Sequence, residues 1–140
     1  MTTVWFEGGE DYAPSAAVRR TVFIDEQGYL PEEEFDEADK TCPHLAIFDG
    51  ETPVAAGRLL FDGTTAKLGR IAVLKPYRGR RLGAAVVEAL LARARALGAG
   101  RAYVSAQSYA VPFYEKFGFR AYGEEYPDGR IPHRDMEMPL

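Results

Sequence analysis

The sequence predicts a mixed α/β fold in which helices pack on one central sheet. Short β-branched and aromatic stretches alternate with Gly- and Asp-rich turns, and one long amphipathic helical pattern lies between two strand patterns. A chain of 140 residues with 46% hydrophobic content can bury one good core and leaves little room for a second. We therefore expect a single domain over residues 1–140.

The first third of the chain predicts a strand, a helix and an acidic segment. Residues 3–7 are β-branched and aromatic and end at a glycine pair, which is typical of a strand. Residues 11–28 predict a helix, with Pro14 in the first turn, Val18 and Val22 four residues apart, and Gly28 as the stop. Residues 30–42 predict an acidic loop or short helical turn, with Phe35 as its apolar anchor.

Three strands follow in a meander. Residues 44–48 and 53–61 are apolar runs that end at Asp49-Gly50 and Asp62-Gly63, both typical turn dipeptides. Residues 67–73 form the third strand pattern, and residues 82–97 repeat apolar side chains near a period of 3.6, which predicts a helix that ends at Gly98.

The remaining residues complete the sheet. Residues 101–107 alternate and predict a strand parallel to 67–73, because a strand, a crossover helix and a strand form a right-handed βαβ unit. Ser108 is expected to cap a short helix that ends at Gly118, and residues 119–124 and 133–138 are expected to close the sheet around a turn at 127–129.

Charge is distributed unevenly along the chain. Residues 1–64 hold 14 acidic and 4 basic residues, and residues 65–140 hold 7 acidic and 13 basic residues. A basic half suits an anionic cofactor, and an acidic half would attract a cationic substrate, although both halves are also consistent with ordinary solvated surface. The net charge of −4 argues against nucleic-acid binding.

Cysteine and histidine usage limits the other functional classes. Cys42 is the single cysteine, so an intramolecular disulfide is excluded, and a spaced zinc signature or a calcium loop is absent from the sequence. We expect no metal, no membrane partner and a cytoplasmic location, because the first residues are acidic and contain no long apolar run. His44 precedes a buried run and is expected to be structural.

The turn at residues 77–84 predicts an anion site. It concentrates three arginines and two glycines just where the long helix begins. The first N–H groups of a helix have no intrahelical partner and carry partial positive charge, so a phosphate is a natural ligand there. A solvated basic loop is the alternative that this turn alone leaves open.

These residues resemble a known motif. The turn resembles the acetyl-CoA-binding motif Gln/Arg-x-x-Gly-x-Gly/Ala of the GNAT superfamily of N-acetyltransferases, with Arg78 and Gly83 at the outer positions and Arg81 in place of the middle glycine. The later pattern Asn-x-x-Ala-x-x-x-Tyr-x-x-x-Gly-Phe is also matched, except that Gln107 replaces the Asn. Further stretches, VFIDEQGYLPEEEFDEAD with PHLAI and the ending IPHRDMEM, resemble the ElaA/YjcF-like branch of that superfamily.

The resemblance implies a GNAT-like acyl-CoA N-acyltransferase fold, a mostly antiparallel sheet in which two parallel strands splay around the pantetheine arm of acetyl-CoA. The implied cofactor-binding residues come from the third meander strand, the turn and the region after residue 107: Ile71, Ala72, Val73, Arg78, Gly79, Arg80, Arg81, Leu82, Gly83, Ala84, Ser108, Phe113 and Lys116.

The resemblance also implies direct attack of an amine on the thioester, with a backbone N–H near Val73 stabilising the oxyanion. Tyr114 is then the candidate general acid, and Glu26 and His133 are the candidate bases. Each has a structural alternative: a core aromatic for Tyr114, a surface acid at a helix end for Glu26, and a strand-end histidine bonded to backbone for His133. Arg70 is expected to pair with a carboxylate such as Glu26.

Two functions remain open at this point. The first is an N-acetyltransferase that transfers the acetyl group of acetyl-CoA to a primary amine of a small molecule, peptide or protein; the second is a non-catalytic acyl-CoA-binding sensor. The presence of Tyr114 favours the enzyme. The acidic run is expected to be a solvated face, with the alternative that Glu33 and Glu34 select a cationic acceptor. Aromatic residues on the closing strands would allow a homodimer.

Overall fold

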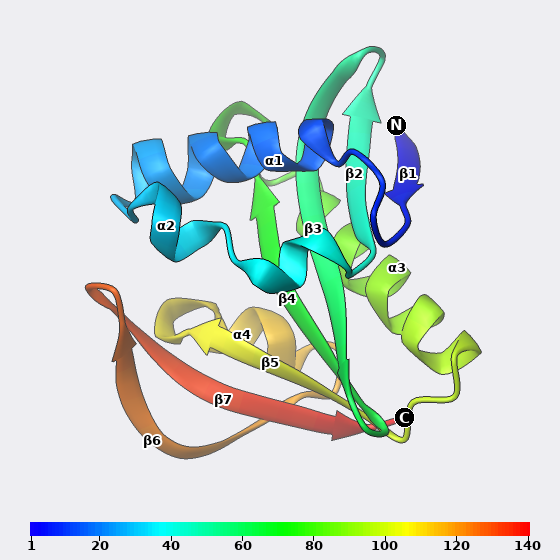
Figure 1. Cartoon of the computed structure of the whole chain (residues 1–140). Coiled ribbons are helices and arrows are strands. Elements are labelled where there is room, and N and C mark those ends of the chain that lie inside the picture. Colours follow the sequence, from blue (N-terminus) through cyan, green and yellow to red (C-terminus); the bar gives the residue numbers. More distant parts are fainter.

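The computed structural model describes all 140 residues, and its framework is one seven-stranded sheet (Figure 1). The strands lie in the order β1-β2-β3-β4-β5-β7-β6. Their bounds are β1 (Thr2–Phe6), β2 (His44–Asp49), β3 (Thr52–Asp62), β4 (Thr65–Val73), β5 (Arg101–Gln107), β6 (Arg120–Asp128) and β7 (Ile131–Pro139). All neighbours are antiparallel except β4 and β5, which confirms the predicted meander and the predicted parallel βαβ unit.

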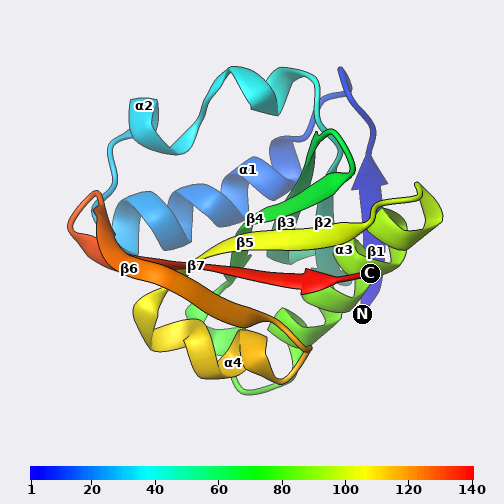
Figure 2. The ribbon, with the colours of Figure 1, turned by 90° about the horizontal axis from the view of Figure 1, so that it is seen from below.

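Helices cover both faces of the sheet, as Figure 2 shows: α1 and α2 lie on one face, and α3 and α4 lie on the other. Their bounds are α1 (Ala13–Arg19), which continues as the π-helical η1 (Arg20–Glu26), α2 (Pro31–Glu34), α3 (Leu82–Ala96) and α4 (Val111–Glu115). Short 3₁₀ turns complete the set: η2 (Glu37–Lys40), η3 (Lys75–Tyr77) and η4 (Ser108–Ala110). The helix predicted over residues 11–28 is therefore confirmed, and its second half is wound as a π-helix, with more residues in each turn.

Two local predictions near the C-terminus are wrong. The closing strands are longer than predicted, so the turn between them moves to Gly129 and Arg130. Ser108 does not cap a helix: it lies inside η4, and its hydroxyl donates to the exposed Glu125 carboxylate at 2.8 Å. A nearby acceptor in the folded chain competes for the hydroxyl with the backbone N–H that a cap would satisfy.

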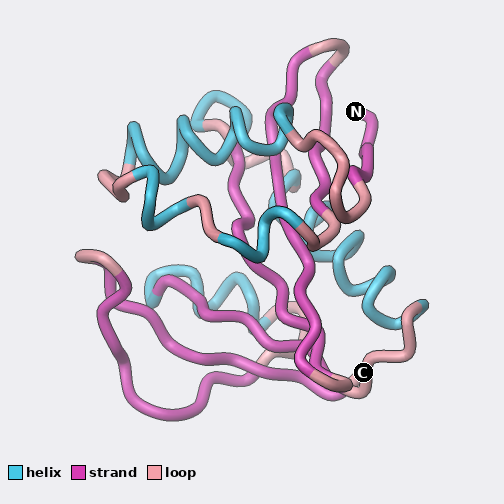
Figure 3. The backbone as a smooth tube through the Cα atoms, in the orientation of Figure 1, coloured by secondary structure: helices cyan, strands magenta, loops and turns pink.

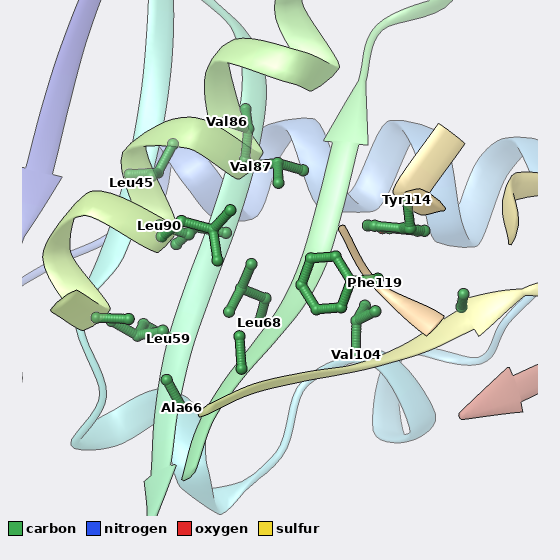
Figure 4. Close-up of a cluster of buried hydrophobic side chains, with 14 of the residues drawn as sticks. Leu45, Leu59, Ala66, Leu68, Val86, Val87, Leu90, Val104, Tyr114 and Phe119 are labelled. Atoms are coloured by element: carbon green, nitrogen blue, oxygen red, sulfur yellow. The ribbon is translucent and has the colours of Figure 1, made fainter. Parts of the chain in front are cut away.

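The main core lies between the sheet and α3 (Figure 4). Val86 and Leu90 of α3 are fully buried against β3, where Gly57 leaves room for them. The same core extends to Tyr114 of α4 and to Phe119, whose rings meet edge to face with centroids 5.8 Å apart. Of the apolar positions that repeat near 3.6 residues, Leu82, Val86 and Leu90 are buried as predicted, whereas Leu97 lies after the end of α3 and is exposed.

The fold opens where β4 and β5 separate. Their parallel pairing covers only Thr65–Leu68 against Arg101–Val104, although both strands continue further. In Figures 1 and 3, β4 rises beside β3 while β5 diverges from it toward α4. The register of β3 and β4 also shifts between Ala56 and Arg58, so that two β4 residues, Arg70 and Ile71, lie opposite one residue of β3. This β-bulge bends β4 away from β5.

Candidate functional site

The separation of β4 and β5 produces a cleft of about 1020 Å³. One wall is β4, and the other is formed by β5 and α4, with η1 and the segment before α2 closing over the top. Both chain regions that carried the sequence prediction, the Arg-rich turn and the segment around Tyr114, line this same cleft.

Most of the predicted cofactor residues line the cleft. These are Ile71, Ala72, Val73, Arg78, Gly79, Arg81, Leu82, Gly83, Ala84, Phe113 and Lys116. The first backbone bond at the start of α3 runs from the Ala85 N–H to the Arg81 carbonyl, so the preceding three N–H groups have no partner within the helix. With the guanidinium groups beside them, these donors fit a pyrophosphate.

Arg81 adopts the backbone conformation that the motif glycine would supply. Its φ is +62° and its ψ is +19°, in the left-handed region, at the residue that precedes α3. Arg81 is exposed and lines the cleft, and it holds this conformation at a cost in free energy that a glycine would not have. The departure from the motif therefore leaves the turn geometry intact.

Two predicted cofactor residues have other partners. Arg80 does not line the cleft, and its guanidinium lies over the Tyr77 ring, 5.0 Å from the ring centre. Ser108 does not line it either, because its hydroxyl is bound to Glu125. The sequence could not separate these residues from their neighbours, since both lie within one residue of side chains that do face the cleft.

Tyr114 reaches the cleft from the core side. The residue is only 8% exposed, yet it is part of the cleft lining. Burial raises the pKa of its phenol well above the ordinary value, so the phenol remains protonated at neutral pH. A protonated phenol at the edge of the cleft can donate a proton or a hydrogen bond to a group placed there.

His133 faces the cleft from β7 with a defined tautomer. Its Nδ1 lies 2.8 Å from the Ile131 carbonyl oxygen, which can only accept, so Nδ1 carries the hydrogen. In the neutral imidazole Nε2 is then left with a lone pair, 3.9 Å from a carboxylate oxygen of Asp128. The hydrogen bond to backbone that a structural role for His133 predicts is therefore present. This bond uses Nδ1, so the lone pair of Nε2 can still accept a proton.

Glu26 is placed differently. It is not part of the cleft lining, and its carboxylate accepts from Arg78 at 2.8 Å. Arg70 pairs with carboxylates, as predicted, but the partner is not Glu26: Arg70 lies 3.3 Å from the Glu34 carboxylate and 3.4 Å from that of Asp36. The bulge in β4 directs Arg70 under α2, which no local sequence pattern predicts.

The acidic segment is not simply a solvated face. Glu34 is 4% exposed and accepts from Arg19 at 2.8 Å, and Asp39 is equally buried between Arg19 and Arg58. Glu33, in contrast, is exposed and lines the cleft. The hypothesis that both Glu33 and Glu34 face an acceptor is therefore wrong for Glu34.

The same cluster also contains the groups most suited to a metal. One ligand atom from each of Asp39, Cys42 and His44 lies within 4.8 Å of the others, and all three residues are buried. Because the Asp39 carboxylate is already bonded to Arg19 and Arg58, the local charge is unfavourable for a cation. His44 instead stacks on Tyr12 with ring centres 3.9 Å apart, in agreement with a structural role.

Several cleft residues were not predicted. Gln27 bonds to Gln107 across the top of the cleft at 2.8 Å, and the Tyr29 phenol donates to the Asp128 carbonyl at 2.8 Å. A second pocket of about 300 Å³ lies on the outer side of Tyr29. One sequence pattern could have identified some of these residues. Buried and half-buried side chains alternate along residues 101–107, which places Tyr103, Ser105 and Gln107 on the same face of β5, the face that lines the cleft.

No helix in the structure combines the length and the apolar character that crossing a membrane requires.

Comparison with known proteins agrees with this geometry. Residues 11–140 match the family model described as an acetyltransferase (GNAT) domain. The chain is 39% identical over 137 residues to the uncharacterised N-acetyltransferase YjcF of Bacillus subtilis, which covers 97% of this chain and 98% of that protein.

Two solved structures share the fold at similar size. An acyl-CoA N-acyltransferase from Pseudomonas aeruginosa superposes with a TM-score of 0.83 at 27% identity and covers 97% of this chain and 99% of its own. Escherichia coli ElaA superposes with a TM-score of 0.86 at 25% identity, with 97% of both chains covered. Together with the cleft and its Arg-rich turn, these matches show that the chain belongs to the GNAT family of acetyltransferases.

Proposed function

We propose that this protein transfers the acetyl group of acetyl-CoA to a primary amine of a small molecule or peptide. The observation that carries the proposal is the single cleft in which the Arg-rich turn, the unpaired end of β4, Tyr114 and His133 all meet. An anion site at one end and a proton donor and acceptor at the other are the arrangement that thioester aminolysis requires.

The cofactor would lie along β4. The backbone of Ile71, Ala72 and Val73 has no strand partner on the cleft side, because the pairing with β5 ends at Leu68. An extended arm can therefore bind there as a strand would, with its pyrophosphate on the turn and the start of α3. Lys116 and Phe113 of α4 line the opposite wall.

The reaction needs three proton transfers besides the attack. His133 Nε2 takes one proton from the incoming ammonium, and the neutral nitrogen then attacks the thioester carbonyl carbon. As the carbon–nitrogen bond forms and the carbon–sulfur bond breaks, the Tyr114 phenol protonates the departing thiolate. The tyrosine regains its proton from the nitrogen through solvent, so the net products are the amide, the free thiol and one proton. Glu26 takes no part in this scheme, because it is paired with Arg78 outside the cleft lining.

Cofactor binding is tested first, by calorimetric titration with CoA and acetyl-CoA. Arg78→Ala should weaken binding about 10-fold or more, the usual effect of losing a charge-assisted hydrogen bond. Arg95→Ala is the matched control, because Arg95 is exposed on the same helix in its last turn, far from the anion site. Absence of binding by the wild type at millimolar ligand would overturn the proposal.

Catalysis is tested by release of free thiol in the presence of primary amines. Tyr114→Phe should lower kcat by about 10²- to 10⁴-fold, the range typical of a lost general acid, while the affinity for CoA is kept. Tyr122→Phe removes a phenol that is 42% exposed and does not line the cleft, and it should leave kcat unchanged. Tight CoA binding without thiol release from any amine would instead support the non-catalytic acyl-CoA-binding protein.

The acceptor end of the cleft favours a cationic amine. Glu33 and Asp128 line it, and neither is bonded to an arginine or a lysine. Glu33→Gln should raise the KM for amines several-fold, about the effect of one partly screened charge, and leave the affinity for CoA unchanged. Glu32→Gln, the exposed neighbour that does not line the cleft, is the control. An unchanged KM in Glu33→Gln would contradict the cationic preference.

A further inference from the structure

The floor of the cleft contains a hydrogen-bonded network that the proposed chemistry does not use. Tyr103 of β5 donates its phenol hydrogen to the Asp135 carboxylate on β7 at 2.6 Å, and Tyr126 of β6 donates to the same carboxylate oxygen at 2.7 Å. Tyr126 is also hydrogen-bonded to the Ser105 hydroxyl on β5. Two phenols from neighbouring strands thus donate to one carboxylate oxygen, and Ser105 joins the network through Tyr126.

The direction of these bonds follows from the carboxylate. Asp135 can only accept, so both phenols must donate to it, and the Tyr126 oxygen is left to accept from Ser105. Burial raises the pKa of Tyr103 and of Tyr126, and the bonds to Asp135 raise both further, so both phenols remain donors at neutral pH. The Ser105 hydroxyl hydrogen is therefore committed to the network, and its oxygen presents only lone pairs to the cleft.

Ser105 occupies a central position in the cleft. It is the first residue of β5 beyond the last parallel pair, Leu68 with Val104, so it lies where the two strands separate. It lines the cleft together with Tyr103 and His133. In the β5–β7 register Ser105 pairs with Asp135, so His133 is its diagonal neighbour on the same face, a separation of about 7–8 Å between such residues. One nitrogen atom between them can contact both side chains.

The charge of Asp135 is not neutralised within the protein. Asp39 and Asp36 are paired with arginines, but Asp135 forms no ion pair. Two cations near the network have other partners: Lys67 lies over the Tyr103 ring, with its nitrogen 5.8 Å from the ring centre, and pairs with Asp62 at 3.7 Å, and Arg101 pairs with Glu137 at 2.9 Å. A half-buried carboxylate without a cation, bonded through a phenol to a hydroxyl in the cleft, is suited to a cationic ligand.

A purely structural role would also join β5, β6 and β7. It would explain the phenol bonds to Asp135, but it does not require Ser105 and Tyr103 to line the cleft, nor the absence of a cation beside the carboxylate. Both features are expected if the network serves a ligand.

We propose that the Ser105–Tyr126–Asp135–Tyr103 network is the docking site for the ammonium group of the acceptor. Ser105 Oγ accepts one N–H of the ammonium, Asp135 supplies the balancing charge through Tyr126, and the nitrogen is held between Ser105 and His133. The acceptor is then an amine whose ammonium form carries at least two N–H groups, one bound by Ser105 and one removed by His133. This inference rests on the proposed function and adds Ser105 as the group that positions the nucleophile, with Tyr126 and Asp135 acting through it.

Binding of primary ammonium probes to the CoA-loaded protein tests the docking site without requiring turnover. The probes are ethylamine, 1,4-diaminobutane and tyramine, titrated calorimetrically. Ser105→Ala should weaken the best probe about 10- to 100-fold, as expected for a lost hydrogen bond to a charged group. Ser105→Thr, which keeps the hydroxyl, should restore binding, and CoA affinity should not change in either variant. Wild-type protein that binds none of the probes, or Ser105→Ala that binds them equally well, would overturn the proposal.

A double-mutant comparison separates positioning from structural support. Tyr126→Phe should weaken the probe in the wild-type background but have little further effect in Ser105→Ala, because Tyr126 acts through Ser105. Additive losses would mean that Tyr126 acts only on the fold and would contradict the proposed coupling. Tyr122→Phe is the matched control: Tyr122 lies opposite Asp135 on β6, is 42% exposed and makes no hydrogen bond to it.

The two levels of proposal fail separately. Probe binding that depends on Ser105, without release of thiol from acetyl-CoA, would support the docking site and overturn the proposed acetyl transfer. Thiol release with unchanged KM and kcat for amines in Ser105→Ala would leave the acetyl transfer in place and overturn the docking site.

Discussion

Two arginines hold a backbone conformation that residues other than glycine rarely adopt. Arg70 has φ +51° and Arg81 has φ +62°, and no other non-glycine residue has a positive φ. Both lie in the candidate site, Arg70 at the bulge of β4 and Arg81 before α3. Left-handed backbone costs about 1–2 kcal/mol for such residues, so the surrounding contacts must compensate for it. At Arg70 these contacts are the bond to the Glu34 carbonyl and the ion pairs under α2.

The strain at Arg81 predicts how its replacements behave. Arg81→Gly should change the free energy of unfolding by less than about 1 kcal/mol, because relief of the left-handed strain offsets the greater entropy of glycine in the unfolded chain. Arg81→Val should cost about 1–3 kcal/mol, because a β-branched side chain tolerates this conformation poorly. Urea unfolding of both variants measures the difference. Equal losses in the two variants would show that the backbone at this residue is not strained.

At the scale of elements, a buried charge network holds α1 and α2 to the sheet. Arg19 of α1, Arg58 of β3 and Arg70 of β4 bind carboxylates of the acidic segment, which crosses over the top of the cleft. The single carboxylate of Asp39 accepts hydrogen bonds from both Arg19 and Arg58. The network thereby connects the first helix, the acidic segment and the bulge that opens the cleft.

Removing one charge from this network should destabilise the fold in a pH-dependent way. Asp39→Asn should cost about 3–5 kcal/mol at pH 7, because it leaves two buried guanidinium groups undercompensated. Hydrogen bonds and charge from Arg19, partly opposed by burial, hold the pKa of Asp39 far below its usual range. A lowered pKa in the folded state adds stability above pH of about 4, the value in the unfolded chain, and this stability is lost as the pH falls toward the folded value.

Urea unfolding between pH 7 and pH 2 measures both effects. The loss of stability below pH 4 should be shallower in Asp39→Asn than in the wild type, although Asp36, whose pKa is lowered by its bond to Arg58, keeps part of the slope. Glu37→Gln is the control, because Glu37 pairs only with Lys40 at the exposed surface. Identical pH profiles for Asp39→Asn and the wild type would contradict this account.

At the scale of the whole molecule, the cleft separates β1–β4 from β5–β7, and a loop contact bridges the two parts at the open end of the cleft. The segment between η1 and α2 carries Tyr29, whose phenol binds the Asp128 carbonyl near the tip of the β6–β7 hairpin. The Tyr29 ring lies so close to Gly129 that an added Cβ would be 2.6 Å from it. This contact closes the cleft on the outer side and separates it from the second pocket.

Displacing Tyr29 should open the acceptor end of the cleft. Gly129→Ala should raise the KM for amine acceptors several-fold while leaving CoA affinity unchanged, because the new methyl group moves the ring off the hairpin. Gly123→Ala is a close control: it lies on the same hairpin with a similar positive φ, but an added Cβ there meets nothing within 4 Å. Both variants carry the same backbone strain, about 1 kcal/mol, so a difference between their KM values isolates the contact with Tyr29.

Most of the framework and part of the cleft lining could be predicted from local patterns. Apolar periodicity placed α3 and β5, turn dipeptides separated β2, β3 and β4, and the Arg-rich turn identified the residues at the start of α3. These predictions succeeded because each depends on neighbours within a few residues, where period and capping report which face is buried and where a helix begins.

Local sequence patterns were sufficient to predict the mixed sheet, the parallel crossover and the Arg-rich turn at the start of α3. The tertiary structure alone decided which charges meet. Arg70 pairs with Glu34 and not with Glu26 because of a one-residue bulge, and Tyr29 reaches Asp128, 99 residues away, because the fold brings the segment between η1 and α2 to the tip of the β6–β7 hairpin. The Ser105–Tyr126–Asp135–Tyr103 network depends likewise on the register of three strands. Such contacts are set by strand register and packing over long sequence separations, and composition and local periodicity contain no record of them.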